Sequence, residues 1–93
     1  MEVPVRRKGE LSKSTIDRTW PHQVALPERL SCREHWPPQN AFCEGLDVSP
    51  RGHCFVRNGE WWNVKCFAHK EDAVRFIERF GGEYMTPQTR PRH

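Results

Sequence analysis

The sequence lacks the short motifs that mark several common enzyme and metal sites. It has no Gly-x-Ser-x-Gly elbow, no glycine-rich phosphate loop, no His-Glu-x-x-His and no Cys-x-x-Cys pair. These absences argue against serine hydrolases, P-loop nucleotide enzymes, zinc metalloproteases and zinc ribbons. We therefore expect a protein without enzymatic activity and without a bound cofactor.

Long apolar runs are also missing. Every apolar stretch falls far short of the roughly 20 residues that a helix needs to cross a bilayer. The N-terminal residues 1–9 include basic side chains but no apolar segment behind them, so they do not resemble a secretory signal. We expect a cytoplasmic protein with no membrane partner.

The positive charge of the chain is concentrated at its two ends. The net charge is +3 over 93 residues, yet residues 14–83 hold nine Lys or Arg and ten Asp or Glu, a net charge of −1. The central part therefore offers no broad basic surface to nucleic acid. Because so short a chain forms one domain at most, we expect a disordered basic arm over 1–13, a single domain over 14–85 and a disordered basic tail over 86–93.

The strongest structural signal is a β-hairpin centred on Asn58 and Gly59. Both residue types accept the positive φ that a type I′ turn requires. A two-residue turn pairs Arg57 with Glu60, Val56 with Trp61, Phe55 with Trp62 and His53 with Val64. One face then carries Phe55, Trp62, Val64 and Cys66, and the other carries Cys54, Val56, Trp61, Asn63, Lys65 and Phe67. Because Asn63 and Lys65 are costly to bury, we expect the first face to be the core side.

An amphipathic helix is predicted after the hairpin, up to Phe80. Its apolar positions recur at i, i+3, i+4 and i+7, and they are Ala73, Phe76, Ile77 and Phe80. Gly81 suits the position after the helix end, and residues 83–85 are long enough for a short edge strand.

The first half of the domain has weaker signals. Within residues 14–26 the even spacing of the large apolar side chains indicates an edge strand, and residues 27–50 are predicted to form a loop with short helices. The expected fold is a small α+β domain: an antiparallel sheet, formed by an edge strand and the hairpin, with one main C-terminal helix packed on one face.

The four cysteines do not form a recognisable zinc pattern. They stand at positions 32, 43, 54 and 66, and two of them belong to Cys-x-x-His pairs. A zinc site formed by Cys32, His35, Cys66 and His69 is one interpretation. The simpler one, which we favour, is inert reduced thiols, because Cys66 already fits the apolar alternation of a strand.

Tryptophan is the residue most in excess for a chain of this length. Trp61 does not fit the core: with Val56 and Phe67 it forms an apolar strip on the face that Asn63 and Lys65 mark as solvent-directed. Two explanations remain open. The 27–50 segment folds over the strip as a lid, or a partner protein or second copy of the chain covers it.

These observations rank two kinds of function above the zinc-stabilised module. The first is a non-enzymatic protein-interaction or regulatory module that uses Val56, Trp61 and Phe67 to bind an unknown protein partner or to form a homodimer. The alternative is a nucleic-acid-binding protein that uses Trp61 as a stacking platform. Its phosphate contacts would come from Arg6, Arg7, Lys8, Arg90 and Arg92.

Four segments carry a resemblance to a group of bacterial proteins. They are Thr15–Pro27, Gly59–Trp62, Cys66–Ala73 and Arg79–Glu83. In these segments the chain resembles short uncharacterised proteins common in alpha-proteobacteria, and the likeness covers residues 15–83. No activity is assigned to that group, so the resemblance implies a bacterial cytoplasmic protein and nothing about its chemistry.

Overall fold

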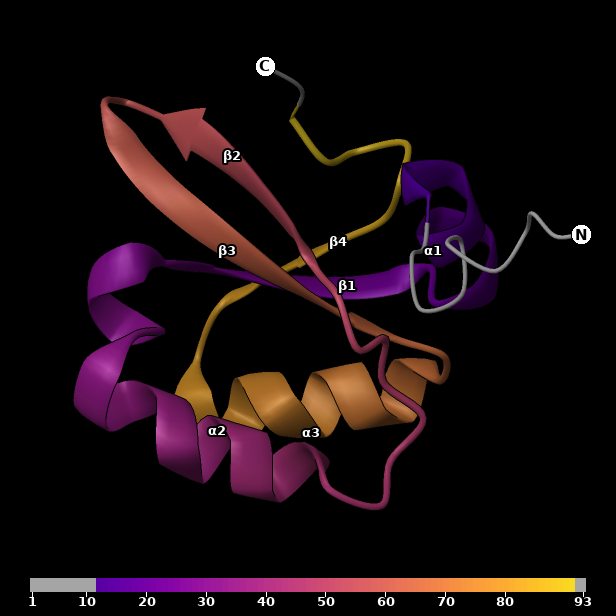
Figure 1. The fold of residues 1–93 in the computed structure, drawn as a ribbon, viewed down its shortest axis with the longest axis horizontal. Coiled ribbons are helices and arrows are strands. Elements are labelled where there is room, and N and C mark those ends of the chain that lie inside the picture. The colour runs from indigo at the N-terminus through magenta and orange to yellow at the C-terminus, as the bar shows by residue number, and fades with distance from the viewer. Residues whose placement is uncertain (1–11, 92–93) are drawn as a thin grey trace, which may run out of the picture.

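The computed structural model describes residues 12–91, which form an antiparallel sheet of four strands with three α-helices (Figure 1). In chain order the elements are α1 (Lys13–Thr19), β1 (His22–Pro27), the 3₁₀ helices η2 (Glu28–Leu30) and η3 (Arg33–His35), α2 (Trp36–Cys43), β2 (His53–Arg57), β3 (Glu60–Phe67), α3 (Lys70–Phe80) and β4 (Glu83–Met85). The strand order is β2-β3-β1-β4. The predicted α+β class is confirmed. None of the described helices is long and apolar enough to span a bilayer.

The hairpin has the predicted turn and register. Asn58 and Gly59 have φ values of 55° and 76°, as a type I′ turn requires. Arg57 pairs with Glu60, and the pairing continues to His53 opposite Val64. The short strand β4 also forms, and it pairs with β1 at one edge of the sheet.

The first strand differs from its prediction in two ways. Residues 13–19 are helical, because the Ser12 hydroxyl caps the helix by accepting a hydrogen bond from the Thr15 amide at 3.1 Å. The spacing of four between Ile16 and Trp20 fits a helix as well as a strand, which is why the alternation misled. The strand proper, β1, lies inside the sheet between β3 and β4 instead of at its edge.

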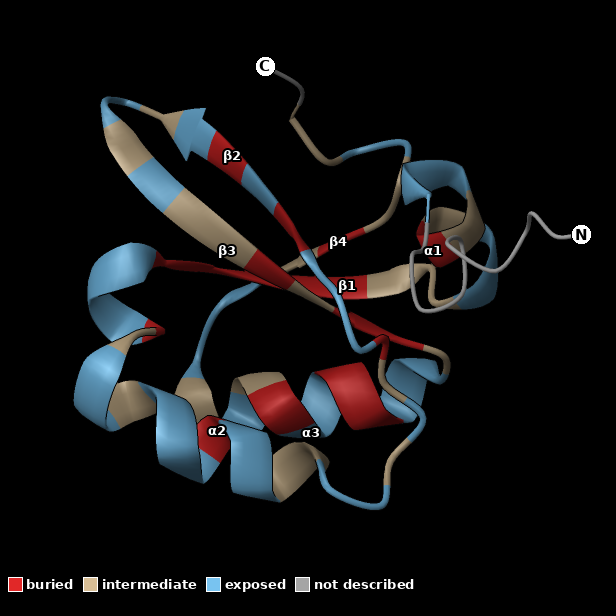
Figure 2. Ribbon diagram, viewed as in Figure 1, coloured by how far each residue is buried: buried red, intermediate tan, exposed pale blue. Residues whose placement is uncertain are grey.

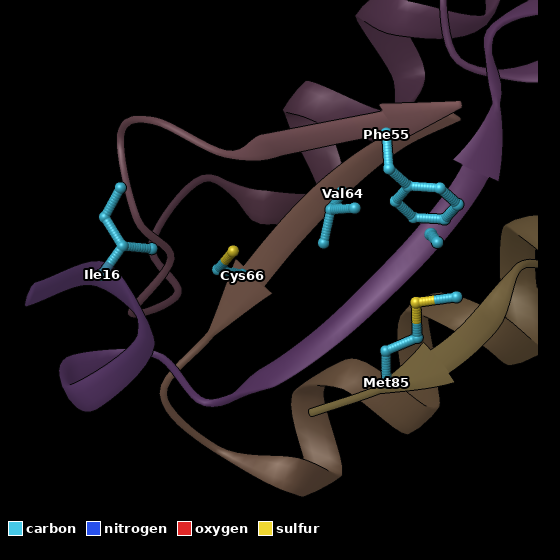
Figure 3. Packing of buried hydrophobic residues seen from close by; sticks show 6 residues of the cluster. Ile16, Phe55, Val64, Cys66 and Met85 are labelled. Carbon is cyan, nitrogen blue, oxygen red and sulfur yellow. The ribbon is translucent and has the colours of Figure 1, made fainter. Parts of the chain in front are cut away.

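Both faces of the sheet are buried near its centre, as the red bands on β1 and β3 show in Figure 2. One face, which we call the concave face, gathers Ala25, Phe55, Val64, Cys66 and Met85 with Ile16 of α1 (Figure 3). The other, which we call the helix face, gathers Val24, Leu26 and Phe67 with Ala73 and Phe76 of α3. The prediction of a single core side is therefore incomplete. Asn63 and Lys65 occupy only part of the helix face, and the main helix lies beyond them.

Helix α2 lies beside α3 below the sheet in Figure 1 and contacts it through aromatic rings. The Phe42 ring meets the rings of Phe76 and Phe80 edge to face, with centroids 5.9 Å and 5.7 Å apart. Phe42 and Leu46 pack on the cluster that contains Phe67. The 27–50 segment thus covers the end of the helix face at Phe67. The lid was expected to cover the whole strip, which also includes Val56 and Trp61.

An ion pair joins the two edge strands across the concave face. The Arg57 guanidinium of β2 donates to the Glu83 carboxylate of β4 at 2.7 Å, and it lies 4.2 Å from the ring centroid of Trp62. Because β2 and β4 are the outermost strands, this contact requires the sheet to curl toward the concave face. Curling lets the sheet cover much of that face without a second helix layer.

Gly82 is the site of the closest backbone approach after α3. A Cβ at this position would lie 2.7 Å from Val24 Cγ1 and 3.1 Å from the Ala25 carbonyl oxygen, on a backbone with φ +115°. We expect Gly82→Ala to lower the free energy of unfolding by about 4 kcal/mol, measured by chemical denaturation. The control is Gly81→Ala: its φ is +85° but nothing lies within 4 Å, so we expect a loss of only about 2 kcal/mol. Equal losses would contradict the packing argument.

Candidate binding site

The predicted strip on the hairpin is only partly exposed. Val56 and Trp61 face each other in the register, and they are 40% and 50% exposed. Phe67, the third predicted member, is fully buried under α3 and packs on Phe76 with ring centroids 5.6 Å apart. Its assignment to the interaction surface was wrong, because α3 covers the far end of the same strand face.

Of the five basic residues that the nucleic-acid hypothesis uses for phosphate contacts, only Arg90 lies among the described residues. Arg6, Arg7, Lys8 and Arg92 lie outside the described residues. The side chain of Arg90 is only 11% exposed, so it is not available as a phosphate contact. Residues 86–90 form a hydrogen-bonded turn where we expected a disordered tail, and Ser12 and Lys13 belong to α1 and its cap instead of an arm.

Arg90 is held by a partly buried polar network on the concave side. It donates to Asp17 at 2.8 Å and 3.2 Å and to the Gln23 side-chain oxygen at 2.8 Å. Asp17 also accepts hydrogen bonds from Gln23 at 3.0 Å and from His53 Nε2 at 2.9 Å. The network connects α1, β1, β2 and the C-terminal turn, so its visible role is to hold four segments together.

The charges in this network are fixed by their surroundings. The hydrogen bond from Arg90 is the largest influence on Asp17, and it lowers the pKa of that carboxyl from 3.8 to about 2 against an opposing effect of burial. Burial, followed by the charge of Arg90, lowers the pKa of His53 below its ordinary value. These influences favour the neutral form of His53, whose Nε2 is hydrogen-bonded to Asp17.

The four residues of the zinc hypothesis are not brought together. No group of three or more potential metal ligands occurs in the described part of the chain. Cys66 belongs to the concave face, whereas Cys32 lines a cavity on the helix face, so the sheet separates the two thiols. Burial raises the pKa of Cys66 to about 12, which leaves it protonated. The four residues of the zinc interpretation therefore do not form one metal site in the described part of the chain.

A cavity of about 280 Å³ lies on the helix face between β1, β3, α2 and α3. Its lining is Val24, Leu26, Ser31, Cys32, Trp36, Gln39, Asn63, Val64, Lys65 and Phe76. The volume is slightly below the range of about 300–1,000 Å³ that is usual for drug-sized ligands. The cavity mixes an apolar floor with several polar groups, as ligand sites commonly do.

The polar wall of the cavity is held in place by hydrogen bonds. The Asn63 amide donates to the Ser31 hydroxyl at 2.9 Å, which ties β3 to the segment after η2. Gln39 is almost fully buried, and its amide donates to the Leu30 carbonyl oxygen at 2.8 Å. These contacts fix the wall before any ligand arrives.

The cavity adjoins the exposed part of the hairpin. Asn63, which lines the cavity, and Trp61 are two positions apart on the same strand face, which places their Cα atoms about 7 Å apart. Trp36 stands at the start of α2, lines the cavity and is 51% exposed. Two half-exposed tryptophans therefore flank one corner of the helix face.

Sequence reasoning missed this cavity, although part of its signal was present. Residues 27–50 were predicted to form a loop with short helices, and proline is well tolerated in the first turn of a helix: α2 begins at Trp36, with Pro37 and Pro38 in that turn. Assigning the two prolines to a first turn would have placed Trp36 on a helix. The approach of Ser31 to Asn63 spans 32 positions and leaves no local signal.

The lowered pKa of Asp17 predicts that the folded protein loses stability in acid. Because its pKa is lower in the folded protein than the ordinary 3.8, the stabilisation is complete above pH 3.8 and is lost as the pH falls toward 2. We expect Asp17→Asn to lower the free energy of unfolding at neutral pH by about 2 kcal/mol, since Arg90 loses its counter-ion. The variant should also show a shallower acid decline in urea denaturation than the parent. The exposed Glu44→Gln serves as control, and parallel pH profiles for the parent and Asp17→Asn would refute the assignment.

A comparison with known proteins adds no family to this geometry. No family model matches the chain, and neither a curated protein nor a solved structure does. The site has to be interpreted from its own residues.

Proposed function

We propose that the protein is a non-enzymatic interaction module that binds a partner protein through Val56 and Trp61 on the outer face of the β2–β3 hairpin. One observation supports this above all others: Trp61, a residue type that dominates binding energy in many interfaces, is half exposed next to the half-exposed Val56. Of the other large aromatic side chains of β2 and β3, Phe55 and Phe67 are fully buried and Trp62 is half buried.

The backbone that presents Trp61 is well supported. On one side of it Glu60 accepts a hydrogen bond from Arg29 of η2 at 2.6 Å. On the other side Trp62 stacks on Phe55 with ring centroids 5.9 Å apart and lies under Arg57. A side chain on a fixed backbone loses little conformational freedom on binding, which favours affinity.

The small size of this surface favours a partner protein that contributes a short segment, and it disfavours a stable homodimer. Val56 and Trp61 together expose on the order of 200 Å² of apolar side chain. A stable interface buries roughly 800 Å² on each partner. A transient contact anchored on one aromatic side chain fits the available surface better.

The resemblance to alpha-proteobacterial proteins supports a bacterial cytoplasm as the setting of this module. Nucleic-acid binding receives no support from the described residues, because Arg90 is committed to Asp17 and Gln23. The interaction module remains the proposal that the exposed side chains favour.

Trp61→Ala is the direct test. We expect it to abolish retention of the partner in quantitative affinity purification from the native host, because alanine removes the aromatic anchor. The melting temperature should stay close to that of the parent, since the ring is half exposed.

Val74→Ala is the matched control, because Val74 is a comparably exposed apolar residue on α3. It should retain the same partner as the parent protein. If all three proteins retain the same set, or if Trp61→Ala unfolds, the hairpin face is not the interaction surface.

A further inference from the structure

The cavity beside α2 contains a single charged side chain, Lys65, among the residues that line it. Lys65 is half buried and has no ion-pair partner among residues 12–91. Asp72, whose charge acts on the Cys43 thiol as the charge of Lys65 does, accepts a hydrogen bond from Arg75 at 3.3 Å. A partly desolvated cation without a counter-ion favours an anion next to it.

The rest of the lining suits a flat ring. Phe76, Val24 and Leu26 form an apolar floor, and each is buried. Trp36 stands at the same cavity with half of its surface exposed, so its ring face can stack on a planar group. Ser31 and Asn63 add hydrogen-bonding groups to the lining of the same cavity.

We propose that this cavity is a binding site for a small aromatic carboxylate, with the ring between Trp36 and the Phe76 floor and the carboxylate at the Lys65 ammonium. The volume of about 280 Å³, at the lower limit of what is usual for drug-sized ligands, suits a free acid of one or two fused rings. The cavity ligand and the protein partner of Trp61 are separate occupants of neighbouring surfaces.

Indole-3-carboxylate and its neutral counterpart indole-3-carboxamide are suitable probes, since they share a ring and differ in charge. Each is titrated into the full-length ¹⁵N-labelled protein, and the side-chain resonances of Trp36 and Asn63 are followed by NMR. We expect saturable shifts for the acid with a Kd near about 1 mM, and binding of the amide weaker by about tenfold.

Two variants locate the interaction. Lys65→Gln should weaken binding of the acid by about tenfold and leave binding of the amide unchanged. Lys70 is an exposed lysine on α3, so Lys70→Gln should change the affinity for neither probe. Trp36→Ala should weaken both probes by about fivefold, through loss of stacking. Trp61→Ala should leave both Kd values unchanged, which separates this site from the proposed protein interface.

Three results would overturn the proposal. One is non-saturating shifts with the acid. Another is equal affinity of the parent protein for acid and amide. The third is an equal effect of Lys65→Gln and Lys70→Gln. If Lys65→Gln fails to give a folded spectrum, the acid-to-amide ratio on the parent and the loss in Trp36→Ala decide the question alone.

Discussion

Strand β1 is buried on both faces, and a short chain must cover both. Val24 and Leu26 point to the helix face, while Gln23 and Ala25 point to the concave face. The α2–α3 pair covers the first of these. The second is covered by the curl of the sheet, by Ile16 of α1 and by the network around Asp17. Burial of a central strand on two sides thus accounts for the positions of all three helices.

Because α2 and α3 cover only part of the helix face, the part that carries Trp61 stays uncovered. Helix α3 spans Phe67 and the middle of β1, and α2 packs against α3 through Phe42 instead of reaching across the hairpin. Trp61 therefore remains half exposed on the part of the hairpin that the two helices do not cover, and the Lys65 cavity opens where α2 and α3 meet the sheet. Each surface is built on a hydrogen-bonded strand, so a ligand meets a wall that is already ordered.

Local signals were sufficient for some elements and insufficient for others. The Asn58-Gly59 pair specifies its own turn, and the apolar period of α3 spans about two turns, so both could be predicted. The pairing of Asp17 with Arg90 joins residues 73 positions apart, and no local pattern encodes it. The same holds for the cavity. Trp61 was recognised because it breaks the alternation, whereas Phe67 was misassigned because burial under a helix cannot be read from a strand pattern.

The ion pair between Arg57 and Glu83 has a consequence for how copies of the protein meet in concentrated solution. It joins the two edge strands of the sheet, which are only five residues (β2) and three residues (β4) long and which carry the charges of Arg57 and Glu83. Amyloid growth requires flat, extended borders onto which another strand can stack in register. Short edge strands that carry charged side chains, such as β2 and β4, disfavour this kind of pairing between copies.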